Sequence, residues 1–128
     1  MQKGGKHSAA AQRSDERRLR EDEAPRLVAE VPDLLTLSLT IEDCSSTSFS
    51  RPRHVRHVVI ASAPALFAIV CSDSNCREGG HDVTRPVMRA LAHRETVFEG
   101  EDACQGSLGS GICTRVLHYD AVATYKIA

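Results

Sequence analysis

The chain has 128 residues, a length that suits one domain of ordinary size. Hydrophobic residues make up 41% of it and aromatic residues only 4%, so a core has to be built mainly from Val, Leu, Ile and Ala. The formal net charge of −1 excludes a global electrostatic attraction to nucleic acid or to an anionic membrane.

The N-terminal part is polar and carries mixed charges, with Leu19 unable to form a buried face alone. We therefore predict a disordered or marginally helical arm over residues 1–24 and a single domain over residues 25–128. The arm lacks the apolar run of a secretory signal. The most apolar stretch, residues 58–71, is too short for a membrane-spanning helix and contains Pro64. These features predict a soluble, cytoplasmic protein without membrane association.

The first predicted element is a strand over residues 34–42. Its apolar residues alternate with polar ones, as in a strand with one wet face, and they are Leu35, Leu37, Leu39 and Ile41. A Ser- and Thr-rich loop follows over residues 43–52. Residues 53–63 and 65–71 are rich in branched apolar side chains and predict two further strands, separated by Pro64.

A helix is predicted over residues 85–93, with Thr84 as its N-cap. Residues 95–100 predict a short strand, and residues 115–127 predict a long one with alternating apolar side chains. The predicted order is β-β-β-α-β-β. Because so little helix is available for parallel crossovers, we predict the α+β class, with a mainly antiparallel sheet of about five strands covered by one helix.

Four of the five cysteines fall into two pairs, each where a predicted strand runs into a turn. Cys71 and Cys76 form a C-x4-C, and Cys104 and Cys113 form a C-x8-C within a glycine-rich loop. Zinc asks for four tetrahedral ligands, commonly two from each of two turns. We therefore predict a structural zinc held by these four cysteines, with His81 as an alternate ligand.

This arrangement is similar to that of zinc ribbons in general, over the second half of the chain. It departs from them in spacing, because C-x8-C is longer than the usual zinc knuckle. Buried reduced thiols, two local disulfides and a reactive thiol are the competing interpretations. Cys44 stands alone in the Ser/Thr-rich loop, and we predict no chemical role for it.

Catalytic motifs are incomplete. His93 and Glu95 match the H-x-E of zinc deaminases, but the accompanying P-C-x-x-C is absent. A cysteine nucleophile with His81 or His118 as base has no supporting motif. The glycines of residues 106–111 lack the Lys-Ser/Thr of a phosphate loop. We leave enzyme activity open and favour a non-enzymatic function.

A basic segment, residues 50–57, contains Arg51, Arg53 and Arg56 and no acidic residue. It offers a basic contact patch, although the interleaved aromatic residues of an RNA-binding sheet are missing. Charges that protect a sheet edge are the simpler interpretation. The acidic run 98–102 could be its partner across the sheet or on another subunit.

The sequence therefore predicts a zinc-stabilised module that acts in protein interaction or regulation. A metal-free interaction domain with buried cysteines is the alternative, followed by an RNA-binding module and by a Cys/His or zinc enzyme. A protein partner is expected, nucleic acid is not favoured, and a homo-oligomer is compatible with the sequence.

Overall fold

The computed structural model of the chain describes residues 9–45, 53–71, 76, 79–109 and 111–127. Its main sheet has four strands in the order β2-β1-β8-β5, with every neighbouring pair antiparallel. These strands are β1 (Leu34–Ser45), β2 (Arg53–His57), β5 (Val97–Ala103) and β8 (Arg115–Tyr125). The predicted α+β class with a mainly antiparallel sheet is confirmed.

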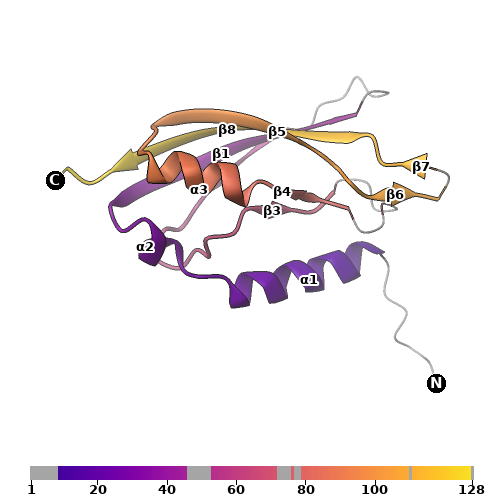
Figure 1. Ribbon diagram of the computed structural model, residues 1–128, viewed down its shortest axis with the longest axis horizontal. Helices are drawn as coiled ribbons and strands as arrows, with labels where there is room; N and C mark the ends of the chain where they lie inside the picture. The colour runs from indigo at the N-terminus through magenta and orange to yellow at the C-terminus, as the bar shows by residue number, and fades with distance from the viewer. Residues whose placement is uncertain (1–8, 46–52, 72–75, 77–78, 110, 128) are drawn as a thin grey trace.

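The remaining elements are short. Two two-stranded ribbons are formed by β3 (Ala68–Ile69) with β4 (His81–Asp82), and by β6 (Ser107–Leu108) with β7 (Gly111–Ile112). The helices are α1 (Ala9–Glu23), α2 (Leu27–Glu30) and α3 (Thr84–Ala92). All three helices and the β3–β4 ribbon lie on one side of the main sheet, whereas the β6–β7 ribbon lies at one end of the molecule (Figure 1). None of the helices in the described residues is long and apolar enough to cross a membrane.

The alternation in β1 and β8 produces the main core. Leu37, Leu39 and Ile41 of β1 are buried, and so are the residues of β8 that share their face, Leu117, Tyr119, Ala121 and Ala123. Val87 and Leu91 of α3 are 0% exposed and belong to the same cluster. The period-two pattern of these two strands thus places one face of the sheet under the helix, and the other face carries mainly polar side chains together with the exposed Val55, Val97 and Val122.

Leu35 departs from the predicted alternation. The register between β1 and β8 shifts between Leu34 and Thr36, which is a bulge or a local irregularity. As a result Leu34 is buried, at 3% exposed, and Leu35 is 49% exposed. A bulge adds one residue to a strand and so exchanges the faces of the residues beyond it.

The two predicted strands over 53–63 and 65–71 are largely wrong. Strand β2 ends at His57, and the second stretch contributes only the two residues of β3. The apolar residues 65–67 are nevertheless buried. Their backbone N–H groups form hydrogen bonds that do not belong to a β-ladder. Ala65 N–H donates to Pro25 O at 2.7 Å, and Phe67 N–H donates to Thr84 Oγ1 at 2.7 Å. The apolar pattern therefore predicted burial correctly over residues 65–68, whereas Val55 and Val59 of the first stretch are 54% and 68% exposed.

Helix α3 starts one residue earlier than predicted, and Thr84 is its first residue rather than its N-cap. The N-cap position is Val83, which has no side-chain cap. Asp82 supplies the local acceptor instead, because its Oδ1 accepts a hydrogen bond from Thr84 N–H at 3.0 Å. Asp82 also forms an ion pair with Arg20 of α1, at 2.5 Å.

Asp82→Ala is expected to destabilise the protein by about 1 kcal/mol at neutral pH, the usual cost of removing a helix-capping side chain. Burial raises the pKa of Asp82, but the hydrogen bonds from Thr84 and the Arg20 guanidinium outweigh it, and the net pKa is lowered. A carboxyl whose pKa is depressed in the folded state stabilises that state above its unfolded pKa, and this stabilisation is lost as the pH falls. Urea unfolding at pH 7 and at pH 3 checks this, and the difference between variant and parent should shrink at pH 3. Asp82→Asn, which keeps an acceptor, should cost less.

Candidate metal centre

The four cysteines at 71, 76, 104 and 113 lie at the end of the molecule that carries the β6–β7 ribbon. Cys71 follows β3, Cys104 follows β5 directly, and Cys113 follows β7 directly. Their side chains form a cluster of their own, separate from the main core, with Leu108 as the partly buried apolar residue packed against it. The exposed fractions of the four cysteines are 3%, 0%, 2% and 4% in chain order.

The sulfur atoms are at the spacing of a single tetrahedral centre. All four Sγ atoms lie within 4.8 Å of one another. Cys71 Sγ is 3.7 Å from Cys113 Sγ, and Cys76 Sγ is 3.6 Å from Cys104 Sγ. A zinc–sulfur bond of about 2.3 Å gives a tetrahedron whose edges are about 3.8 Å, close to both distances. A disulfide would bring two sulfurs to about 2.05 Å, and none of these four cysteines forms one.

The long C-x8-C spacing has a structural explanation. The β6–β7 ribbon lies between Cys104 and Cys113 in the sequence, and it brings the chain back beside Cys104. Cys113 N–H donates to Gly106 O at 2.9 Å, and Cys104 N–H donates to Arg115 O at 2.9 Å. The short sulfur–sulfur distances join one cysteine from each sequence pair, so the two pairs interleave.

Backbone amides provide hydrogen bonds to one of the sulfurs. Gly80 N–H lies 3.3 Å from Cys104 Sγ and Gly106 N–H lies 3.4 Å from it. Gly80 has φ +133°, a conformation that L side chains rarely adopt. N–H donors favour a thiolate over a thiol. Amides directed at a ligand sulfur are therefore suited to a metal-bound thiolate.

The thiols differ in their acidity. Burial opposes ionisation of Cys104, but hydrogen bonds from Gly106 and Gly80 outweigh it and lower its pKa. Burial raises the pKa of Cys76 to about 11, and its hydrogen bond with Cys104 adds to the rise. Several thiolates this close together repel one another unless a cation lies between them. The donor set therefore suits a divalent metal, because metal binding requires deprotonated sulfur.

The backbone of Gly79 lies directly against two of the sulfur atoms. A Cβ atom at this position would lie 2.4 Å from Cys76 Sγ and 2.6 Å from Cys104 Sγ. Ordinary contacts of a Cβ begin at 3.4 Å, so only glycine leaves room for both sulfurs. In the sequence, the glycines beside the cysteines were the feature that indicated a close approach of the backbone to the sulfur atoms. The two N–H···S contacts had no signal of their own.

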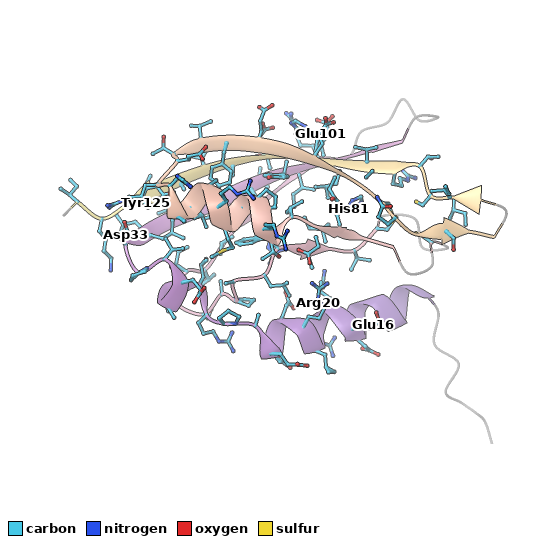
Figure 2. All side chains as sticks on the ribbon, viewed as in Figure 1. Glu16, Arg20, Asp33, His81, Glu101 and Tyr125 are labelled. Carbon is cyan, nitrogen blue, oxygen red and sulfur yellow. The ribbon has the colours of Figure 1, made fainter. Side chains whose placement is uncertain are left out.

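His81 is outside the four-sulfur group. It is 2% exposed and belongs to β4, and its Nδ1 is 3.2 Å from Asp102 Oδ2 of β5. Figure 2 shows His81 on the helix side of the sheet. The contact joins the strand that follows Cys76 to the strand that precedes Cys104. His81 therefore contributes to the framework around the four sulfurs, and its pairing with Asp102 had no signal in the sequence.

The basic patch is not assembled on one face. Arg53 pairs with Glu42 across β1, at 3.3 Å, whereas Arg56 lies opposite Leu39 and so belongs to the other face of the sheet. Arg51 lies outside the described residues, as does the side chain of Cys44. Strand β2 and the acidic strand β5 are at opposite edges of the sheet, so they do not pair with each other within one chain.

A second group of ligand-type side chains lies on the sheet face away from the core. Oxygen and nitrogen atoms of Glu99, His118 and Asp120 are within 4.8 Å of one another, and all three residues are exposed or half-buried. His118 Nε2 is 3.5 Å from Asp120 Oδ2. Exposed acidic side chains commonly gather in this way without a metal, and we treat the group as a charged surface feature.

In comparisons with known proteins, no family model, curated protein or solved structure matches this chain significantly. The fold and the site therefore have to be interpreted from their own geometry. Together they define an α+β chain in which four buried cysteines lie close enough together to hold one metal ion.

Proposed function

We propose that the chain is a small cytoplasmic module whose fold is completed by one structural zinc ion. Cys71, Cys76, Cys104 and Cys113 are the proposed ligands. The observation that carries the proposal is the buried group of four sulfurs within 4.8 Å of one another. Four protein sulfurs complete a tetrahedral shell and leave no open position for water or substrate, which is the arrangement of structural rather than catalytic zinc.

Zinc is favoured over an iron–sulfur cluster by the spacing. Four thiolates suit either group, but a cluster places several irons and inorganic sulfides between the cysteines and so holds their sulfurs further apart. The distances of 3.6 and 3.7 Å support a single ion. Reduced cysteines that bind a metal suit a reducing compartment such as the cytoplasm.

The module acts, in this proposal, through its surface and in contact with another protein. The metal would supply folding free energy rather than chemistry. One face of the main sheet is turned away from the three described helices, which all lie on its opposite side (Figure 1), and this supports a surface role. A metal-free domain with the same four buried thiols is the second candidate, because reduced cysteine is among the residue types most often buried in protein interiors.

Elemental analysis of untagged protein, combined with a count of reactive thiols, tests the proposal. We expect one zinc ion per chain in the parent protein, and we expect this ion to be released when a thiol reagent blocks the four cysteines. The Cys76→Ser variant should contain no zinc. Cys44→Ser is the matched control and should retain the zinc. Protein that contains no metal, keeps its fold and has five reactive thiols after denaturation would instead support the metal-free candidate. Stoichiometric iron would contradict the choice of metal.

A further inference from the structure

The two edges of the main sheet carry opposite charge. Strand β2, Arg53–His57, is one edge and contains basic residues and no acidic ones. Strand β5, Val97–Ala103, is the other edge and contains acidic residues and no basic ones. Among the described residues each of these strands pairs with a single strand of its sheet, β1 or β8. Like charges at an edge discourage pairing between chains, whereas opposite charges at the two edges attract.

The directions of the two edge strands suit a shared ladder. Each neighbouring pair in the order β2-β1-β8-β5 is antiparallel, so β2 and β5 run in opposite directions. Placing β2 of one copy beside β5 of another, with equivalent sheet faces on the same side, therefore gives an antiparallel pair. The joined strands continue the sheet from one copy into the next.

One register of that ladder places an apolar residue opposite an apolar one and a basic residue opposite an acidic one. Val55 is 54% exposed and Val97 is 74% exposed, and both belong to the face away from the core, because they lie opposite Thr40 and Val122. When Val55 of one copy is opposite Val97 of the next, Arg53 is opposite Glu99, two residues along each strand. Aliphatic and opposite-charge cross-strand pairs each contribute roughly 0.2–1 kcal/mol.

The surroundings of Glu99 favour an incoming cation. Glu99 lies directly opposite Asp120 on β8, and like charges in that position repel. Glu101 lies on the same face, which Figure 2 shows directed away from the helices. Arg53 is 60% exposed and is 3.3 Å from Glu42 of its own chain. Its guanidinium has five N–H donors and can contact Glu42 and a second carboxylate together.

We propose that copies of this chain associate head to tail, with β2 of one copy paired with β5 of the next. The partner is thus a second copy of the same chain. Because the contact uses different surfaces on the two copies, it generates rings or open chains rather than a two-fold dimer. The inference names a partner for the proposed interaction module, but it rests on the main sheet and not on the cysteines, so metal content and self-association are tested separately.

Sedimentation of the full, metal-containing chain over a concentration series at low salt tests the association. We expect concentration-dependent species larger than a monomer, which dissociate as salt screens the Arg53–Glu99 contact. Arg53→Glu and Glu99→Arg should each weaken association at least tenfold. An equimolar mixture of the two variants should associate again, because each β2 edge then meets a β5 edge of opposite charge.

Matched controls separate this edge contact from a general effect of charge. Arg85→Glu on α3 and Glu30→Arg on α2 make the same changes at exposed positions away from both edges, and they should associate like the parent. Val97→Lys should weaken association without altering the Arg53–Glu42 pair. Circular dichroism of each variant verifies the fold.

Three results would overturn the proposal. One is a parent chain that stays monomeric at all concentrations. Another is association that Arg53→Glu leaves unchanged. The third is a mixture of the two charge-reversed variants that fails to recover, which would mean that one edge pairs with itself.

Discussion

Zinc-loaded protein treated with a strong chelator is expected to lose structure first at the cysteine end, while the main sheet stays folded. The reason is that the two buried clusters are separate. The main core joins β1, β8 and α3, whereas the four thiols have Leu108 as their partly buried apolar neighbour. Ordering a residue costs roughly 1–2 kcal/mol of backbone entropy. Four thiols and one leucine cannot offset this cost over residues 104–113 without the metal.

The magnitude of the effect follows from metal binding. Structural zinc sites contribute on the order of 10 kcal/mol to the folded state at neutral pH, which is comparable with the whole stability of a typical domain. We therefore expect hydrogen exchange at Cys104 and Cys113 to rise by several orders of magnitude after chelation. Amides in the paired centre of β1 and β8 should remain protected. The melting temperature should fall as well.

Re-addition of zinc should restore protection at the cysteine end and is the control for damage by the chelator. Acidification is expected to release the metal too, because protons compete for the thiolates and metal affinity falls as the pH falls. Unchanged exchange at Cys104 and Cys113 after verified zinc removal would show that packing alone holds this end. The proposed structural role of the metal would then be wrong.

Gly79→Ala is expected to weaken metal binding by about 100-fold, the upper end of the range for changes in the shell around metal ligands. The new Cβ would lie 2.4 Å from Cys76 Sγ and 2.6 Å from Cys104 Sγ, where ordinary contacts begin at 3.4 Å. One or both sulfurs would have to move by roughly 1 Å, but metal–ligand distances vary by only about 0.2 Å. Competition with a chromophoric zinc chelator measures the change in affinity.

Gly109→Ala is the matched control, since a Cβ at this position has nothing within 4 Å. Both glycines lie near the cysteine cluster in sequence, yet only one of them is pressed against the sulfurs. Gly109→Ala should therefore bind zinc like the parent. Equal affinities for parent and Gly79→Ala would mean that the sulfurs are not held where the structure places them.

The sheet was largely predictable because side-chain alternation is a local property. The buried faces of β1 and β8 were predicted from period-two patterning, and helix α3 from its apolar face. Leu35 was placed on the wrong face, since a shift in register depends on how a neighbouring strand pairs. The strands predicted over residues 53–63 and 65–71 form only at Arg53–His57 and Ala68–Ile69. Between these short strands, the backbone N–H groups of Ala65 and Phe67 donate to Pro25 and Thr84 instead of to a neighbouring strand, and a local pattern cannot show such partners.

The candidate site was predictable in composition but not in geometry. Four cysteines at strand ends indicated a possible metal site, and glycines beside them indicated tight turns. Spacing alone could not show that a two-stranded ribbon separates Cys104 from Cys113 and returns the chain to close the group. The pairing of His81 with Asp102 depends on the approach of β4 to β5, which is a tertiary feature without a local signal.

X-ray absorption at the zinc edge of the purified protein tests the central claim most directly. The account predicts a single shell of four sulfurs at about 2.3 Å, with no nitrogen or oxygen ligand and no second metal nearby. That result would establish a closed four-cysteine site. A ligand shell that contains nitrogen or oxygen would contradict this claim. Purified protein that shows no zinc absorption edge would contradict it as well.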